Sequence, residues 1–173
     1  MAKGTASVNR RTDIVNSAIE VFAEIGYYRA TTAQVAERAE ISQPYVFRFF
    51  TKESLMVEAL EVSFQRILRA FRNVIETTGK EQLETGLIRE YETIMDQHRS
   101  EILLQMQAQT IREEPIRKAM QKGMQEIHQM VYEAFRAAEI GDPQGRSEVF
   151  LARGLLCNVS MALELPELMK KNK

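Results

Sequence analysis

Residues 31–52, TTAQVAERAEISQPYVFRFFTK, predict two short helices joined by a tight turn, and this pair constrains the rest of the chain. Thr31 is suited to cap the first helix, and Gln34 lies three residues later, where it completes a capping box. Ser42 offers a second N-cap, and Pro44 falls in the first turn of the second helix, where its missing N–H costs no hydrogen bond. Two helices this short cannot bury a core alone. The flanking segments must therefore hold them.

An amphipathic helix precedes the pair. Apolar residues recur at helical spacing from about Arg10 to Ile25, and Gly26 ends the helix because glycine accepts the left-handed conformation of a helix C-terminus. Residues 1–9 are expected to form a loose arm. The three helices form a unit that holds the second short helix outward, as in a helix-turn-helix that enters a DNA groove. Its predicted core is drawn from Ile14, Ala18, Phe22, Ile25, Val35, Ala36, Ala39, Ile41, Val46 and Phe50.

Longer helical segments follow Lys52, and no strand pattern, internal repeat or low-complexity segment appears in the sequence. Glycine and proline mark the breaks, at Gly79 and at Gly141-Asp142-Pro143. The expected helices cover about 54–77, 81–98, 100–111 with Ser100 as cap, 113–139 and 145–164, with at most one short helix and a frayed tail after Pro166. The fold class is therefore all-α with eight or nine helices, divided into residues 1–52 and residues 53–173.

Composition excludes several classes of protein. The single cysteine, Cys157, allows no internal disulfide and fits a reducing compartment. The longest charge-poor run, residues 149–163, contains Arg153 and is shorter than the ~20 residues of a membrane span. No segment resembles a signal peptide, so a cytoplasmic protein without membrane contact is expected. The net charge is −1, and residues 1–55 hold seven Lys/Arg against six Asp/Glu, so any DNA contact depends on a few placed cations and backbone N–H groups.

The run FAEIGYYRATTAQVAERAEISQPYVFRFFTKESL, residues 22–55, resembles the DNA-binding half of the tetracycline-repressor (TetR) family. The shared features are a Phe-Ala-x-x-Gly helix ending, a threonine-capped second helix, an Ala-x-x-Ser turn, an aromatic-rich third helix and a Lys-x-x-Leu start to the fourth. The resemblance implies a homodimer of two-domain subunits that binds double-stranded operator DNA and is released when a small-molecule effector enters the C-terminal domain. It implies no cofactor.

Three features depart from that family pattern. Glu40 stands where the family usually has glycine in the turn, so either a non-glycine residue adopts that backbone geometry or the turn differs slightly. Phe47 replaces the usual tyrosine and lacks a hydroxyl that is often aimed at a phosphate. The chain ends soon after Pro166, where many relatives continue into a full ninth helix, so the dimer interface is expected to differ in detail.

Side chains at the start of a recognition helix reach base edges in the major groove. Gln43 is the predicted base reader because its amide both donates and accepts, as the adenine edge requires, while Pro44 or Tyr45 packs on a thymine methyl. Phosphate contacts are assigned mainly to Thr31, Thr32, Arg48, Phe49 and Lys52. Thr31 and Ser42 are explained equally well as helix caps, and Phe47 and Phe50 are expected to pack in the core. The predicted DNA-binding set is Thr31, Thr32, Ser42, Gln43, Pro44, Tyr45, Arg48, Phe49 and Lys52.

Methionines beyond Met1 all follow Lys52 and gather on the middle helices. Methionine adapts to irregular shapes, so these residues either pack the core or line a pocket for an apolar or aromatic ligand. The polar side chains suited to orient such a ligand are Tyr91, His98, Gln105, Gln109 and His128, and neither histidine is assigned to a metal. The predicted ligand-binding set is Tyr91, Met95, His98, Met106, Gln109, Met124 and His128.

The segment 149–163 is apolar almost all round, so a two-fold pairing with its counterpart is expected to cover it, aided by the helix that ends near Glu139. Its predicted interface residues are Phe150, Ala152, Gly154, Leu155 and Val159. Two alternatives stay open, a ligand-independent DNA-binding regulator and a protein-recruiting module. An enzyme or metal carrier is disfavoured because the sequence holds no paired ligand motif, Ser/His/Asp pattern, phosphate-binding glycine loop or second cysteine.

Overall fold

Helices make up the fold, in agreement with the all-α prediction. The computed structural model describes residues 2–169, with side chains from Arg10 onward. Between these limits lie eight α-helices and two 3₁₀ segments: α1 (Ala2–Ile25), α2 (Thr32–Arg38), α3 (Gln43–Phe47), α4 (Lys52–Thr77), η1 (Lys80–Gln82), α5 (Leu83–Gln97), α6 (Arg99–Ala108), α7 (Glu114–Ala137), α8 (Pro143–Ala162) and η2 (Pro166–Leu168).

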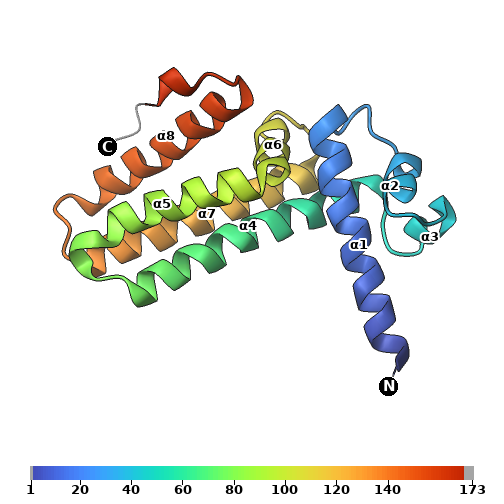
Figure 1. Cartoon of the computed structure of the whole chain (residues 1–173), viewed down its shortest axis with the longest axis horizontal. Helices are drawn as coiled ribbons and strands as arrows, with labels where there is room; N and C mark the ends of the chain where they lie inside the picture. The colour runs from blue at the N-terminus through green and yellow to red at the C-terminus, as the bar shows by residue number, and fades with distance from the viewer. Residues whose placement is uncertain (1, 170–173) are drawn as a thin grey trace.

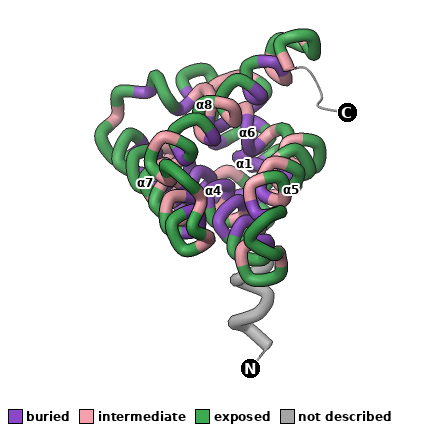
Figure 2. Tube along the Cα trace, turned by 90° about the vertical axis from the view of Figure 1, so that its left-hand side faces the viewer, coloured by how far each residue is buried: buried purple, intermediate pink, exposed green. Residues whose placement is uncertain are grey.

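The helices form two groups. Figure 1 shows α1, α2 and α3 at one end of the molecule, while α4, α5, α7 and α8 run alongside one another over the rest. The short helix α6 packs against both α1 and α4, so it lies at the junction of the two groups. In the end-on view of Figure 2 the buried residues of the long helices face one another around a common centre.

The predicted breaks and caps define most helix ends. Gly26 follows α1 with a φ of 80°, and Asp142 caps α8 by accepting a hydrogen bond from the Gly145 N–H at 3.1 Å. A second capping box, which the sequence analysis missed, joins Thr51 to Ser54 and starts α4 at Lys52. These local hydrogen bonds satisfy backbone groups that a helix terminus leaves unpaired.

Two predicted boundaries are wrong. Residues 2–9, expected as a loose arm, continue α1, since no proline interrupts the segment and the helix propagates through it. Ser100 does not cap α6: α5 and α6 follow each other directly, so His98 is both the C-cap of one and the N-cap of the other. Met1 and the predicted frayed tail at residues 170–173 lie outside the described residues.

The predicted core of the first unit is confirmed. Ile14, Ala18, Phe22, Val35, Ala36, Val46 and Phe50 are buried, Ile25 and Ile41 pack half-buried against them, and Ala39 is half-buried. In the second group the Phe150 ring lies 5.7 Å from the ring of Phe71 and 6.1 Å from that of Phe135, all within a buried cluster. Each group of helices thus has an apolar centre that holds its outer side chains in place.

Two chemical features are missing from residues 2–169. No helix there is both long enough and apolar enough to cross a membrane. Nor do three His, Cys, Asp or Glu side chains of this part of the chain gather where they would hold a metal ion.

Candidate functional site

Helix α2 begins with the predicted capping box. The Gln34 N–H donates to Thr31 Oγ1 at 3.2 Å, and the Thr31 N–H donates to Gln34 Oε1 at 2.9 Å. At its other end Arg38 pairs with Glu20 at 2.8 Å and with Glu24 at 2.7 Å, which ties α2 to α1. The side-chain hydrogen bond from Arg38 also lowers the pKa of Glu24 below its usual value. Helix α2 is therefore fixed at both ends.

Thr32 points inward and contacts the predicted base reader. Its side chain is 7% exposed, and its Oγ1 accepts a hydrogen bond from Gln43 Nε2 at 3.0 Å. The Gln43 amide keeps its Oε1 and the second Nε2 hydrogen, which are the acceptor and donor that an adenine edge needs. The burial of Thr32 does not fit the phosphate contact predicted for it, and its position favours a role in orienting Gln43.

The turn between α2 and α3 keeps the left-handed backbone that a glycine would adopt, although residue 40 is a glutamate. Glu40 adopts a left-handed conformation with a φ of 53°, and the Ile41 N–H donates to Ala36 O at 2.9 Å. A non-glycine residue adopts this conformation at a cost of about 1 kcal/mol. Ser42 takes the N-cap position of α3, but its exposed hydroxyl makes no capping hydrogen bond. The hydroxyl is therefore not committed to the cap.

The aromatic residues of α3 and its continuation divide between core and surface. Val46 and Phe50 are buried, while Tyr45 and Phe49 are half-buried with their rings 5.3 Å apart. Phe47 is 57% exposed, so the expectation that it packs in the core is wrong. Val46 and Phe50 take the inward direction, and the residue after Val46 is rotated by about 100° away from it. Phe47 is thus an exposed aromatic residue beside the predicted base contacts.

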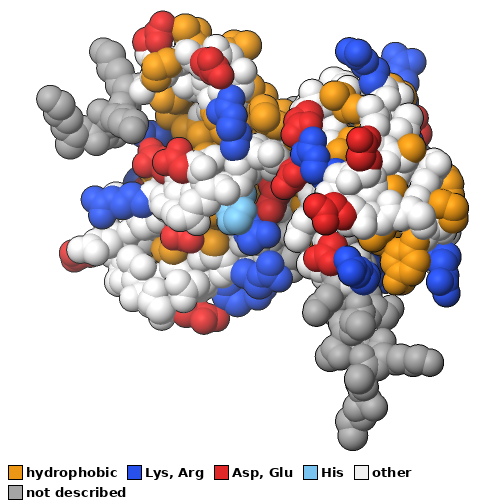
Figure 3. Space-filling model, turned by 45° about the vertical axis from the view of Figure 1, so that its right-hand side comes forward, with side chains coloured by type: hydrophobic (Ala, Val, Ile, Leu, Met, Phe, Trp, Pro, Cys, Tyr) orange, Lys and Arg blue, Asp and Glu red, His pale blue; other side chains and the backbone are white. Residues whose placement is uncertain are grey.

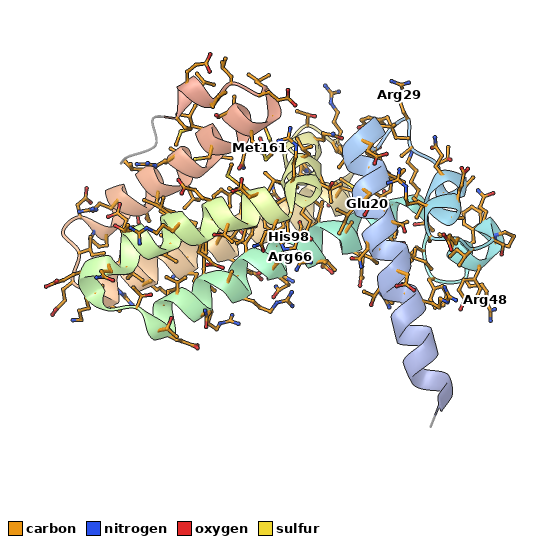
Figure 4. All side chains as sticks on the ribbon, in the orientation of Figure 1. Glu20, Arg29, Arg48, Arg66, His98 and Met161 are labelled. Carbon is orange, nitrogen blue, oxygen red and sulfur yellow. The ribbon has the colours of Figure 1, made fainter. Side chains whose placement is uncertain are left out.

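Two cations border this surface. The exposed Arg48 lies on the outer side of the α1–α3 group, away from the long helices (Figure 4), with its guanidinium 5.5 Å from the centre of the Tyr45 ring. Lys52 is held differently, because its Nζ donates to the carbonyl of Tyr28 at 3.2 Å and lies 4.7 Å from the Tyr27 ring centre. Arg29, in the same loop as Tyr28, is exposed at the end of α1 (Figure 4). Arg29 was not singled out from the sequence.

Charges of both signs share the surface. On the face drawn in Figure 3, Lys and Arg side chains are interspersed with Asp and Glu, as the near-zero net charge suggests. A surface of this kind provides individual phosphate contacts and no broad basic field. We use the name reading surface for five residues of this region: the exposed Pro44, Phe47 and Arg48 and the half-buried Gln43 and Tyr45.

A cavity of about 50 Å³ lies among α4, α5, α6, α7 and α8. Three residues of the predicted ligand-binding set line it, namely Tyr91, Gln109 and Met124. The same cavity is also lined by Asn158, which was not predicted, and by Gln105 and Met120, which were named but left out of the predicted set. The remaining lining residues are Ile67, Phe71, Ile127, Phe150, Leu151, Gly154 and Leu155.

The other four predicted ligand-binding residues do not line this cavity. His98 lies at the α5–α6 junction, where its Nδ1 is 3.6 Å from Glu101 Oε1, and Met95 and Met106 are half-buried elsewhere. His128 lies in an open groove between α4 and α7, with its Nε2 3.4 Å from Ser147 Oγ. Figure 4 shows His98 close to Arg66 in projection, and Glu101 accepts hydrogen bonds from Arg66 Nε at 2.9 Å.

Polar groups at the cavity wall are paired with one another. The Tyr91 hydroxyl donates to Asn158 Oδ1 at 2.9 Å, and burial raises the pKa of Tyr91 to about 12, so it remains a donor at neutral pH. Gln105 Nε2 donates to Ser63 Oγ at 2.9 Å, which connects the cavity wall on α6 to α4. Gln107 Nε2, also on α6, donates to the Ala23 carbonyl of α1 at 2.8 Å. Helix α6 therefore links the cavity to both α4 and α1.

The predicted dimer-interface residues on α8 point in two directions. Ala152, Leu155 and Val159 are exposed, but Phe150 is buried in the core and Gly154 faces the Tyr91 ring, which a Cβ at 154 would contact at 3.5 Å. Exposed apolar side chains that the prediction omitted extend the outer face of α8: Val149, Leu156 and Leu163. We call this set, Val149, Leu155, Leu156, Val159 and Leu163, the α8 face.

Replacing Thr32 by valine is expected to reduce base discrimination clearly, while the overall affinity for DNA changes little. Valine keeps the volume but removes the acceptor for Gln43 Nε2, so the amide gains rotational freedom. We expect a change of less than about 1 kcal/mol in overall affinity with reduced discrimination at one base pair of each half-site. Selection of sequences from a random DNA library measures both, and Thr32→Ser, which keeps the hydroxyl, is the control. An unchanged base preference in T32V would contradict this role.

Comparisons with known proteins agree with this organisation. Residues 14–60 match the family model described as "Bacterial regulatory proteins, tetR family". A comparison with curated protein sequences gives no match. Among solved structures, the fatty acid degradation regulator FadR from Bacillus halodurans is similar over 90% of this chain and 85% of its own, with a TM-score of 0.78 and 13% identity.

Two further structures have the same fold. A FadR from Bacillus subtilis in complex with stearoyl-CoA covers 88% of this chain and 87% of its own, at a TM-score of 0.73 and 15% identity. The ketosteroid regulator KstR2 of Mycobacterium tuberculosis covers 88% and 82%, at a TM-score of 0.71 and 19% identity. Residues 14–60 thus match the DNA-binding helix-turn-helix domain of the TetR family of transcriptional regulators, and the solved structures share the all-helical fold of the rest of the chain.

Proposed function

We propose that this chain is a ligand-responsive repressor that binds palindromic operator DNA as a homodimer and is released by a small apolar or aromatic effector. The observation that carries the proposal is the course of α4. This single helix begins at Lys52, next to the α1–α3 group, and reaches the cavity with Ile67 and Phe71. One rigid element therefore connects the cavity wall to the reading surface.

Operator binding is supported by the reading surface. Gln43 presents a donor and an acceptor, and Arg48 places a cation at the outer edge of the helix-turn-helix. Two copies related by a two-fold axis would present their α3 helices to successive major grooves about 34 Å apart. An effector that favours a wider spacing would lower operator affinity, and by linkage operator DNA would lower effector affinity equally.

The apolar effector is supported by the composition of the cavity wall. No charged side chain is among the residues that line the cavity of about 50 Å³, and two flexible methionines, Met120 and Met124, lie in its wall. Two neighbours of the same fold are named for fatty acid degradation or ketosteroid regulation, and a third, from Bacillus subtilis, was solved with stearoyl-CoA. At about 50 Å³ the cavity is smaller than the ~300 Å³ or more of typical ligand pockets, so binding requires these side chains to move.

Gln43→Ala tests the DNA-binding half of the proposal. Loss of the amide is expected to lower affinity for a palindromic probe by about 1–3 kcal/mol per half-site and to abolish discrimination at the contacted base pair. Fluorescence anisotropy with the selected probe and with single-base variants measures both quantities. Gln121→Ala, at an exposed position of α7, serves as the matched control. Unchanged affinity and preference in Q43A would remove Gln43 as base reader.

The small cavity volume also favours a second candidate, a DNA-binding regulator that takes no ligand. The two candidates differ in one measurement, the release of the labelled operator probe during titration with a panel of neutral apolar and aromatic compounds. Release by any compound that also raises the melting temperature supports the effector-responsive repressor. A compound that binds without changing operator affinity contradicts the coupling through α4.

A further inference from the structure

A second, smaller cavity adjoins the first beneath α8. It has a volume of about 20 Å³ and shares Tyr91, Phe150 and Gly154 with the larger cavity. Gly154 has no side chain to fill the space beside the Tyr91 ring, where a Cβ would lie 3.5 Å from Cε1. The two spaces therefore adjoin, and the methionines line only the larger one while Arg153 lines only the smaller one.

Arg153, which lines the smaller cavity, holds an unpaired donor. Arg153 Nε is buried and has no hydrogen-bond partner among residues 10–169, whereas the Tyr91 hydroxyl donates to Asn158 and Gln105 Nε2 donates to Ser63. A buried N–H of a charged group is rarely left without an acceptor, because its desolvation is then uncompensated. Arg153 thus offers a charged donor at the smaller cavity.

Charge is distributed along this space in a way that selects a class of ligand. The larger cavity is lined by uncharged side chains, so it suits the apolar body of a ligand. The smaller one contains Arg153 and Glu92, but Glu92 is exposed, and no ion pair joins the two in the described part of the chain. A guanidinium whose Nε is free prefers a carboxylate as its acceptor.

We propose that the effector is an amphiphile with one long apolar body and a terminal carboxylate, held with the body against Met120 and Met124 and the carboxylate at Arg153. This inference rests on the effector-responsive function proposed above and narrows its ligand. Arg153 selects the head group, while the methionines accommodate bodies of different shape. Tyr91, between the two cavities, stays protonated and packs against the body near its head.

The test uses three probes with the same twelve-carbon body and different heads: dodecanoate, dodecanol and dodecyltrimethylammonium, each below its micelle concentration. Isothermal titration of the full chain is expected to show dodecanoate binding at least tenfold more tightly than dodecanol, with the cationic probe weakest. In Arg153→Met the advantage of dodecanoate over dodecanol should disappear while dodecanol affinity stays within twofold. Arg89→Met, at an exposed position of α5, should keep the advantage.

Three outcomes overturn the head-group inference. Dodecanol binding as tightly as dodecanoate to the unaltered chain would leave the apolar-effector function standing and remove the carboxylate. A dodecanoate preference that survives in R153M would assign the carboxylate to another residue. If none of the three probes binds, the single-chain amphiphile is wrong, and operator release by the panel of apolar and aromatic compounds then decides the broader function separately.

Discussion

A Gly123→Ala variant is expected to be destabilised by about 2–3 kcal/mol, with a melting temperature lower by about 5–10 °C. Alanine normally stabilises a helix interior by about 1 kcal/mol relative to glycine. Here a Cβ at residue 123 would lie 2.2 Å from Cδ2 of Phe64, whose ring is 2% exposed and enclosed by the core. The clash between α7 and α4 therefore outweighs the gain in helix propensity. Thermal and urea denaturation followed by circular dichroism measure the change.

Gly79→Ala is the matched control for Gly123→Ala. A Cβ at residue 79 meets no atom within 4 Å, and the backbone there has an ordinary φ of −66°. Its stability should change by less than about 0.5 kcal/mol. Equal stability of G123A and the unaltered chain would mean that α7 moves away from α4 at little cost. The close packing at Gly123 would then not hold α4 in position.

Helix boundaries were predictable wherever local chemistry determines them. The capping box of Thr31 and Gln34 requires only residues three apart, and the break at Gly141-Asp142-Pro143 requires only its own backbone. The left-handed Glu40 was one of the two turn geometries that the family pattern allowed, because a turn geometry depends on few neighbours. The second capping box, Thr51 with Ser54, had the same local signal but was overlooked.

Side-chain directions were harder to predict because they depend on how helices pack. Phe47 and Phe50 are both aromatic and three residues apart, yet only Phe50 is buried, since the chain leaves α3 after Phe47. His128 lies on the same helix as Met124, but it faces the groove with α4 and not the cavity. Periodicity places a residue on a helix face, and only the neighbouring helices determine what that face contacts.

Thr32 shows how a contact between elements changes the interpretation of a residue. As a hydroxyl at the start of α2 it was assigned to phosphate, and the sequence gives no sign that Gln43, eleven residues away, reaches it. The same holds for Arg153, which the sequence placed only as a charge in an apolar run. Its significance depends on the adjoining cavities and on the lack of an acceptor for its Nε among the described residues.

Charging the α8 face is expected to have the largest effect on operator binding. The double variant Leu155→Glu and Val159→Glu places two carboxylates, one helical turn apart, on a surface where apolar side chains are exposed. If this face pairs with its two-fold counterpart, the four charges would repel one another and lose solvation, so the variant should be monomeric at micromolar concentration. Sedimentation velocity measures the mass of both proteins.

Loss of the dimer removes the benefit of linking two half-sites, which typically contributes 10²–10⁴ in affinity. We therefore expect at least about a hundredfold weaker binding of the variant to a palindromic probe, and nearly unchanged binding to a single half-site. Stability should change little because the two side chains are 41% and 36% exposed, even though Leu155 also lines the cavity. Gln121→Glu with Gln125→Glu repeats the spacing on α7 as a control. A dimeric L155E/V159E variant would show that another surface pairs the subunits. If the unaltered chain is monomeric and still binds the palindrome tightly, the homodimer is not part of the mechanism. The spacing of the two α3 helices then does not control operator affinity.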